Sequence, residues 1–401
     1  MSAIRLALAG RTHRAIGLMS GTSHDGIGAA LVEINERVHP AAKLIGFHAY
    51  PYPNKLRHRL LEASAGGKVG AAELSELNFL LGYAFAQAAM DVARRVGMRR
   101  AHISFIGSHG HTFFHLPPRR AVKGQTPSTL QLGESAVIAA ITGVPVVADF
   151  RPMDLVLLGE GAPLAPLAHL WMFAHPRLGR VVQNIGGIAN ATYIPAGARA
   201  DRIDRRVFAF DTGPGAMIID AIAAKLSHAR FRMDRDGKMA ARGRVNQALL
   251  AELMRNPYFR RRPPKSTGRE EFGADYVARI EARARALGVG GIDLIATVTA
   301  LTARSIAEAF RRFMIPRGGG DQLIATGGGA HNPTLMRMLR EELKEVEVVT
   351  AAQLGVDGDA LDAVAFAILA YQMLCGRPGN IPSVTGARSP AILGKLTLPP
   401  R

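Results

Sequence analysis

Two stretches of this chain share one unusual pattern, an apolar strand, a turn of small polar residues and a second apolar strand. The first spans residues 15–33 and turns at Ser20-Gly-Thr-Ser-His-Asp-Gly26. The second spans residues 181–194 and turns at Asn184-Ile-Gly-Gly-Ile-Ala-Asn190. No helical period follows either turn, so both stretches predict β-hairpins rather than a P-loop or dinucleotide fingerprint, whose glycines open a helix. The repetition predicts a duplicated domain.

The same order of elements follows each hairpin, namely a third strand and then alternating helices and strands. Strand patterns occupy residues 44–50, 103–108, 144–148, 207–210, 323–326 and 346–349. Helical patterns occupy residues 71–96, 217–225, 292–313 and 334–344. This alternation predicts an α/β fold with a mostly parallel sheet in each half and a cleft between the halves. We expect one domain at 1–150, completed by 372–401, and a second at 151–371.

Composition narrows the class of protein and its partners. No apolar run reaches the roughly 18 residues that a membrane span needs, and residues 1–14 lack the long apolar core of a signal peptide. Cys375 is the only cysteine, which excludes an intramolecular disulfide and predicts a cytoplasmic location. The net charge is +18, but the basic residues are dispersed and the aromatic residues are few, so we do not expect nucleic acid as the main partner.

The two hairpin turns are the first candidate binding sites. Glycines let the main chain approach a phosphate closely, while amides and hydroxyls donate to it. Each turn alone fits an ordinary tight turn equally well, but two of them facing one another would clamp a triphosphate. The candidate residues are Ser20, Gly21, Thr22, Ser23, Asp25, Gly26, Asn184, Gly186 and Gly187. Asp25 would also hold a magnesium-bound water.

A third glycine-rich segment, Gly327-Gly-Gly329, separates a predicted strand from a predicted helix. Without side chains, Gly327, Gly328 and Gly329 would let a flat adenine or ribose lie against the main chain. An ordinary loop, with Asn332 capping the following helix, is the alternative. We expect Asn332 to do both.

The candidate catalytic residue is Asp211, in the sequence Phe-Asp-Thr-Gly-Pro-Gly at positions 210–215. A carboxylate at the end of a strand is a suitable general base, and the glycines leave room for a substrate. The alternative is that Asp211 caps the next helix or forms a turn. Several residues separate it from that helix, so capping explains it poorly.

Further polar residues stand among apolar neighbours, and we expect them to contact a substrate. They are His109, Asp149, Arg151, Thr212 and Asp362. Arg151 can hold a carboxylate through two hydrogen bonds, whereas Asp362 either faces the cleft or caps its own helix. The segment 265–270 is either a substrate loop or a solvated one. A zinc site at His109, His111 and His115 lacks supporting carboxylates and spacing.

Nine motifs resemble, in order from residue 17 to about 387, those of the anhydro-N-acetylmuramic acid kinase family. They begin at Gly17, Ser108, Asp149, Gly161, Asn184, Phe210, Lys265, Gly327 and Ser383. The resemblance implies two actin-like (ribonuclease H-like) domains, an interdomain ATP cleft, Mg²⁺, a homodimer and a role in cell-wall recycling. It also implies a reaction in which water opens the 1,6-anhydro bridge and O6 takes the γ-phosphate.

The family's residue roles carry over to matching positions. The resemblance makes Asp211 the base toward water, Gly21, Thr22 and Ser23 the phosphate grip, and Arg151 a sugar-binding residue. The chain departs from the usual family residues at Gly28 (Asp), His111 (Gln), Pro152 and Met153 (Arg), Ala216 (Asn) and Asp362 (Glu). Two alternatives stay open, a kinase for another 1,6-anhydro sugar such as levoglucosan and an inactive nucleotide- or sugar-binding relative.

Overall fold

The computed structural model describes residues 12–21, 26–38, 40–64, 69–199, 202–318 and 320–400. The chain divides into two compact units. Unit 1 comprises Met1–Ala174, Arg199–Arg205 and Ala360–Arg401, and unit 2 comprises His175–Ala198 and Arg206–Asp359. These bounds differ from the expected breaks at 150 and 371, because helix α6 (Pro166–Phe173) packs on helix α14 (Leu361–Leu374), and α14 packs on the sheet of unit 1.

Unit 1 is built on one mixed sheet, in the order β12-β6-β4-β1-β2-β3, with β5 paired to β4. Its strands are β1 (His13–Ser20), β2 (Gly26–Ile34), β3 (Ala42–Pro51), β4 (Phe105–Leu116), β5 (Ser128–Leu132), β6 (Val146–Ala148) and β12 (Lys395–Thr397). β1, β2 and β3 form an antiparallel meander, whereas β4 runs parallel to both β1 and β6. The expected first hairpin and its third strand are therefore confirmed.

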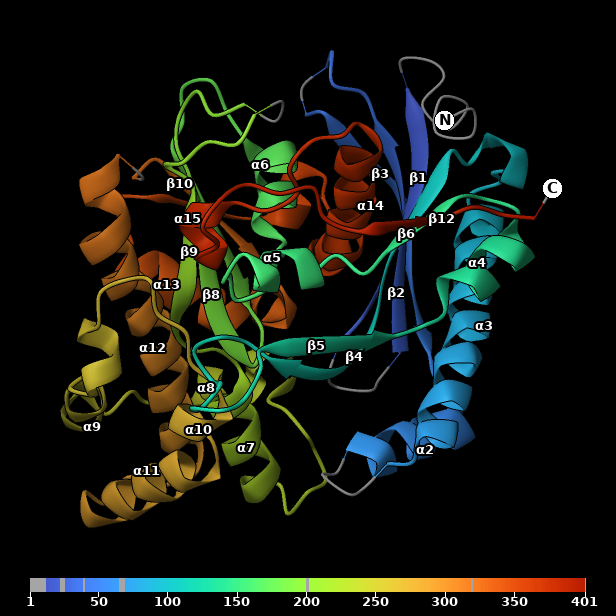
Figure 1. The fold of residues 1–401 in the computed structure, drawn as a ribbon. Helices are drawn as coiled ribbons and strands as arrows, with labels where there is room; N and C mark the ends of the chain where they lie inside the picture. The colour runs from blue at the N-terminus through green and yellow to red at the C-terminus, as the bar shows by residue number, and fades with distance from the viewer. Residues whose placement is uncertain are drawn as a thin grey trace. The chain divides into compact units, whose positions relative to one another are not determined.

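Helices cover the sheet of unit 1 (Figure 1). Helix α3 (Ala71–Arg95) packs on β1 to β5, and its buried residues include Leu77, Leu81 and Phe85. Helix α14, nearly 300 residues further along the chain, packs on β1, β2, β4 and β6. The other helices of the unit are α2 (Asn54–Ser64), α4 (Ser135–Thr142), α5 (Pro152–Val156), α6 and α15 (Pro382–Thr385).

The approach of α14 to the sheet explains two glycines of the strands. A Cβ at Gly17 in β1 would overlap the carbonyl oxygen of Ala363, and one at Gly107 in β4 would overlap that of Phe366. Only glycine permits this close packing of helix main chain on strand main chain.

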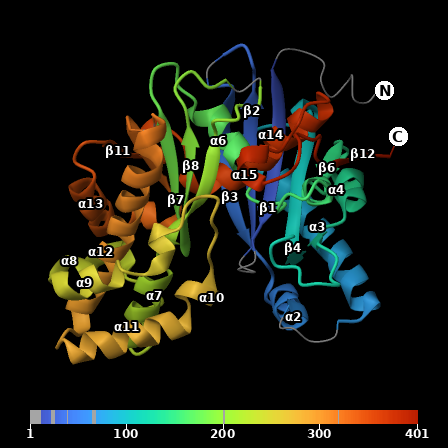
Figure 2. The ribbon, with the colours of Figure 1, turned by 60° about the vertical axis from the view of Figure 1, so that its left-hand side comes forward.

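Unit 2 repeats the arrangement with a five-stranded sheet, in the order β11-β10-β7-β8-β9. Figure 2 labels its strands β7, β8 and β11. Its strands are β7 (Arg180–Ile185), β8 (Ile188–Ile194), β9 (Phe208–Pro214), β10 (Gln322–Thr326) and β11 (Glu347–Thr350). Its helices are α7 (Met217–Leu226), α8 (Lys238–Arg242), α9 (Gln247–Leu253), α10 (Arg269–Phe272), α11 (Ala274–Ala286), α12 (Gly291–Ala309) and α13 (Pro333–Glu342). The second hairpin, β7–β8, and its third strand β9 repeat the meander of unit 1.

Both units thus have the expected α/β architecture of the actin-like class, in which an antiparallel meander is extended by parallel strands. The expectation of a mostly parallel sheet is wrong, because antiparallel pairs of the described strands outnumber parallel ones in unit 1 and equal them in unit 2. Within the described ranges, no helix is long and apolar enough to cross a membrane. Two local expectations are wrong. The strand expected at 103–108 does not end there, because it continues as β4 to Leu116 and forms a hairpin with β5. Asp211 lies in the middle of β9, which extends past it to Pro214.

Candidate active site

The candidate base, Asp211, is held at three points by a segment that follows β9 in the chain. Its backbone N–H donates to the carbonyl of Lys265 at 3.2 Å. Its backbone carbonyl accepts from the Tyr258 hydroxyl at 2.7 Å, and its Oδ2 accepts from the Thr267 N–H at 2.9 Å. Because β9 is an edge strand, these contacts replace those of a further strand and fix the carboxylate.

The surroundings of Asp211 favour a carboxylate that can accept a proton. Burial raises its pKa to about 6, against the N–H of Thr267 and the charge of Lys265, which both lower it; Glu270 raises it further. A pKa just below neutrality leaves the group ionised at pH 7 yet more basic than an ordinary aspartate. That is the property a general base needs.

A row of residues crosses the sheet of unit 2 and connects Asp211 to two glycine-rich segments. Thr326 of β10 pairs with Asn184 of β7, Asn184 with Asn190 of β8, and Asn190 with Asp211 of β9. The turns that follow β7 and β10 therefore begin at the same edge as the carboxylate. The structure brings these three predicted parts of the site together within one unit.

The glycine turns of this row are tightly packed. The carbonyls of Gly186 and Gly187 accept from the N–H groups of Ala216 and Gly215, which ties the β7–β8 turn to the start of α7. A Cβ at Gly327 would overlap the side chain of Asn184, and one at Gly329 would overlap the side chain of Ile185.

The middle glycine of the run 327–329 differs from its two neighbours. No described atom lies within 4 Å of the position that a Cβ would take at Gly328. Asn332 caps α13, as expected, by accepting from the Leu335 N–H at 3.0 Å. A ligand can therefore approach the main chain at Gly328.

Thr212 is placed differently from the other predicted substrate residues. Its side chain is buried, its hydroxyl donates to the carbonyl of Ala189, and it accepts from Gln183 Nε2. These contacts explain Thr212 as a link between β9, β8 and β7. A substrate contact of this residue remains a prediction.

In unit 1, Ser20 ends β1 and lies in a buried polar group. Its hydroxyl accepts from the Tyr52 hydroxyl at 2.7 Å and lies 3.1 Å from Nδ1 of His111. His111 therefore fixes the residue at which the first hairpin turn begins. No described atom lies within 4 Å of a Cβ position at Gly21, whereas Gly26 starts β2 against the carbonyl of Tyr50. Thr22, Ser23 and Asp25 lie outside the described residues.

Arg151, which follows β6, is hydrogen-bonded to His109 of β4. The Arg151 Nε donates to His109 Nε2 at 2.8 Å, and its Nη1 donates to the Gly161 carbonyl at 2.7 Å. Burial, and then the charge of Arg151, keeps the pKa of His109 well below its usual value, so this imidazole is neutral and accepts at Nε2. Burial lowers the pKa of Arg151 to about 10, against Asp362 and Asp154, which leaves the guanidinium charged.

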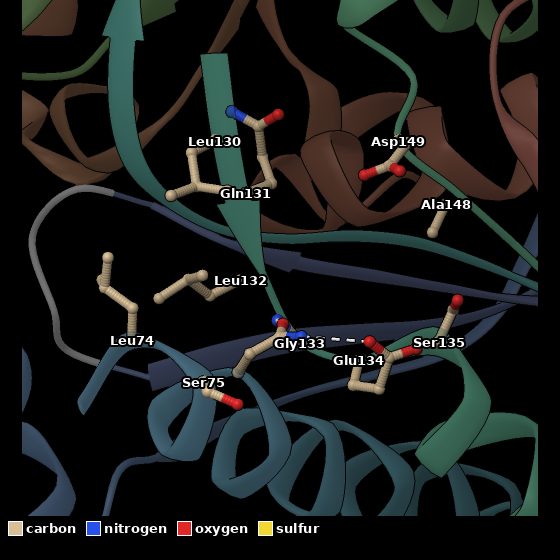
Figure 3. A pocket seen from close by; sticks show the side chains of 11 residues that line it. Leu74, Ser75, Leu130, Gln131, Leu132, Gly133, Glu134, Ser135, Ala148 and Asp149 are labelled. Atoms are coloured by element: carbon tan, nitrogen blue, oxygen red, sulfur yellow. Dashed lines mark hydrogen bonds between the residues drawn. The ribbon is translucent and has the colours of Figure 1, made fainter. Parts of the chain in front are cut away.

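Asp149, two residues before Arg151, lines a different place. It has a positive φ of 56° and accepts from Lys395 Nζ at 2.8 Å. With Ala148 it borders a pocket of about 390 Å³, together with residues of α3, β5 and the start of α4 (Figure 3). No other predicted substrate residue lines this pocket. Neither Arg151 nor His109 lines this pocket, so it does not connect Asp149 to that hydrogen-bonded pair.

Asp362 is the second residue of α14. Its side chain is exposed to solvent, and its charge acts on Arg151. The alternative that it caps its own helix is wrong, because Ala360 holds the N-cap position without a side-chain hydrogen bond.

Sequence reasoning missed Asp154, which anchors the Arg151 region. Its carboxylate is fully buried and accepts from the Gly161 N–H at 2.8 Å, from Asn380 Nδ2 at 2.7 Å and from the Thr385 hydroxyl at 2.8 Å. An acid in an apolar stretch three residues after Arg151 was the available signal. Its partners Asn380 and Thr385, more than 220 residues away in the chain, gave none.

The meander-plus-parallel topology of both units, the glycine turns at strand ends and the carboxylate on the third strand of unit 2 fit the sugar-kinase class that the sequence motifs resemble. The model of one such family, anhydro-N-acetylmuramic acid kinase, matches residues 13–399, and the chain belongs to this family.

Curated relatives of the same description agree with this assignment. One from Caldanaerobacter subterraneus subsp. tengcongensis is 41% identical over 385 residues, covering 96% of each chain. One from Salinibacter ruber is 41% identical over 401 residues, covering 98% of each chain. The similarity therefore covers nearly the whole length of this chain and of each relative.

Proposed function

We propose that this protein is an ATP-dependent kinase that opens and phosphorylates 1,6-anhydro-N-acetylmuramic acid. The observation that carries the proposal is Asp211, a positioned carboxylate with a raised pKa that lies in one row with two glycine turns. Family membership supplies the sugar. The product would be N-acetylmuramic acid 6-phosphate, an intermediate of cell-wall recycling. We further propose that the protein is a cytoplasmic homodimer.

The proposed reaction has a hydrolytic and a phosphoryl-transfer component. A water oxygen bonds to C1 of the sugar while the C1–O6 bond breaks, and Asp211 takes a proton from that water. O6 accepts the γ-phosphoryl group, and ADP leaves. Water is a poor nucleophile, so a positioned base would contribute roughly 10²–10⁴-fold to this step.

The remaining residues of the proposed site bind and orient. The open main chain at Gly21 and Gly328 fits the close approach of a nucleotide, and the turn at Gly186 and Gly187 would add amide donors. Mg²⁺, when bound to the triphosphate, supplies charge neutralisation, and we propose that Asp25 contacts it through water. Arg151 would meet the lactyl carboxylate of the sugar, a charged contact of roughly 1.5–3 kcal/mol.

The proposal is tested by incubating the purified protein with ATP, Mg²⁺ and a small panel of anhydro sugars. We expect 1,6-anhydro-N-acetylmuramic acid to be the best substrate, with a 6-phosphorylated product by mass spectrometry. In ¹⁸O-water, a rapidly trapped product should carry the label at C1 and not in its phosphate. Equal turnover of levoglucosan, which lacks the carboxylate, would show that the sugar is wrongly assigned, and label in phosphate would indicate simple ATP hydrolysis.

A further inference from the structure

The side chain of Lys265 is a buried cation beside the candidate base. It is only 7% exposed. Its ammonium donates to the Tyr258 carbonyl at 3.2 Å and lies 4.5 Å from the centre of the Tyr258 ring. The rings of Phe313 and Phe210 lie 5.3 and 5.6 Å from it. The three rings form an aromatic cage, whose faces attract a cation.

Lys265 belongs to the segment 258–267, which holds Asp211 in place. Its own carbonyl accepts from the Asp211 N–H, and the Tyr258 of its cage donates to the Asp211 carbonyl. Two residues further on, the Thr267 N–H meets the Asp211 carboxylate. Any movement of Lys265 would therefore shift all three contacts of the base at once.

The placement of Lys265 has an electrostatic consequence as well. A lysine ammonium is costly to bury unless charge or rings compensate it. Arg312 and Arg261 also face it and oppose its charge, whereas Asp211 favours it. In return, the ammonium favours the ionised form of Asp211 against burial and against Glu270.

We propose that Lys265 is a positioning residue of the reaction: its aromatic cage fixes the segment whose Thr267 N–H orients Asp211, and its ammonium keeps that carboxylate ionised. The inference rests on the proposed function, because it assigns Lys265 a role toward the proposed base. Burial raises the pKa of Asp211, and the charge of Lys265 opposes that rise. Burial, followed by the charges of Arg312 and Arg261, lowers the pKa of Lys265 to about 8.

The first test compares kcat/KM for the anhydro sugar as a function of pH in Lys265→Met and in the wild type. The methionine keeps the length and apolar stem but removes the charge, so the acid limb should move upward by about one pH unit. At acid pH, kcat/KM of the variant should therefore be about tenfold further below that of the wild type than it is at pH 8. Affinity for a non-hydrolysable ATP analogue should stay within a few-fold.

Two further variants separate positioning from a merely structural role. Lys265→Arg retains the charge and should keep the acid limb near that of the wild type. Lys225→Met, which removes an exposed lysine paired with Glu281 on the same unit, should leave the whole profile unchanged. A lower melting temperature in Lys265→Met with an unshifted acid limb would overturn the inference.

The outcome for Asp211→Asn distinguishes the two proposals. Full turnover in that variant removes the base itself, whereas an inactive Asp211→Asn together with an unshifted Lys265→Met removes only the role of Lys265.

Discussion

Unit 1 and unit 2 each contain an aspartate held by contacts from distant parts of the chain, and the two are held differently. Asp154 in unit 1 is fully buried, and both its oxygens accept hydrogen bonds, three in all within the described residues. Asp211 in unit 2 is partly exposed, and the described residues give its carboxylate one hydrogen bond, at Oδ2. A buried carboxylate is stabilised when hydrogen bonds fill its acceptor sites. An acceptor site that stays open is available to a ligand.

The difference indicates what each carboxylate does. Asp154 joins α5 to the segment around Asn380 and Thr385 and supports the loop whose Gly161 carbonyl accepts from Arg151. Asp211 keeps acceptor capacity for a ligand. The first aspartate should therefore matter for stability and the second for turnover.

The largest effect is expected for Asp211→Asn, which tests the role of the aspartate in unit 2. The amide keeps the size of the side chain and can still accept from Thr267, but it cannot take a proton from water. We expect turnover to fall by at least about 10²-fold, with nucleotide affinity within a few-fold of the wild type. Steady-state kinetics and calorimetric titration of an ATP analogue measure the two quantities. Near-normal turnover would remove Asp211 from the role of base.

The corresponding change in unit 1 is Asp154→Ala. It leaves the Gly161 N–H, the Asn380 amide and the Thr385 hydroxyl without their shared acceptor. Unfilled buried donors cost about 1–3 kcal/mol each, so we expect a loss of about 3 kcal/mol in the free energy of unfolding. Urea denaturation measures it. An unchanged midpoint would mean that the network contributes nothing to stability.

The pH dependence of stability sharpens the contrast. The pKa of Asp211 is raised from 3.8 to about 6 by burial, so the folded state is favoured below pH 3.8 and loses that advantage as the pH rises through 6. At pH 7 the wild type carries this penalty, and Asp211→Asn does not. We expect the Asn variant to be more stable than the wild type by about 3 kcal/mol at pH 7, with the difference vanishing near pH 4. Thermal unfolding at the two pH values tests it, and a less stable Asn variant at pH 7 would contradict it.

The smallest expected effect belongs to Thr385→Val, which keeps the shape of the side chain. It removes the donor to Asp154 and the long 3.4 Å contact with the Ala387 N–H. One buried hydrogen bond contributes about 1 kcal/mol, so the loss in unfolding free energy should be about a third of that for Asp154→Ala. Turnover should hardly change. A loss as large as that of the alanine variant would show that Thr385 has a packing role beyond its hydroxyl.

Much of the fold could be predicted from local pattern alone. The two hairpins, the helix at 71–95 and the cap at Asn332 depend on residues close together in the sequence, where periodicity and turn chemistry decide. The course of β4 past His109 could not, because it depends on pairing with β5. The association of α14 with unit 1 depends on contacts across most of the chain.

The candidate site divides in the same way. Asp211 and the glycine turns carry their own local signals, and the structure brings those of unit 2 into one row. The sequence offered no means of pairing Tyr258 and Lys265 with Asp211, or Asn380 and Thr385 with Asp154. Such pairs exist only once the sheet and its edge segments have assembled.

The packing of α14 against the first sheet has a consequence for the order in which the protein is made. β1, β2 and β4 are synthesised early, yet the helix that fills the face above Gly17 and Gly107 leaves the ribosome more than 240 residues after β4. Until then, an apolar sheet face stays open in the nascent chain, where aggregation or a chaperone competes for it. Unit 1 can therefore reach its final form only after α14 has been made, although its first strands precede unit 2 in the chain.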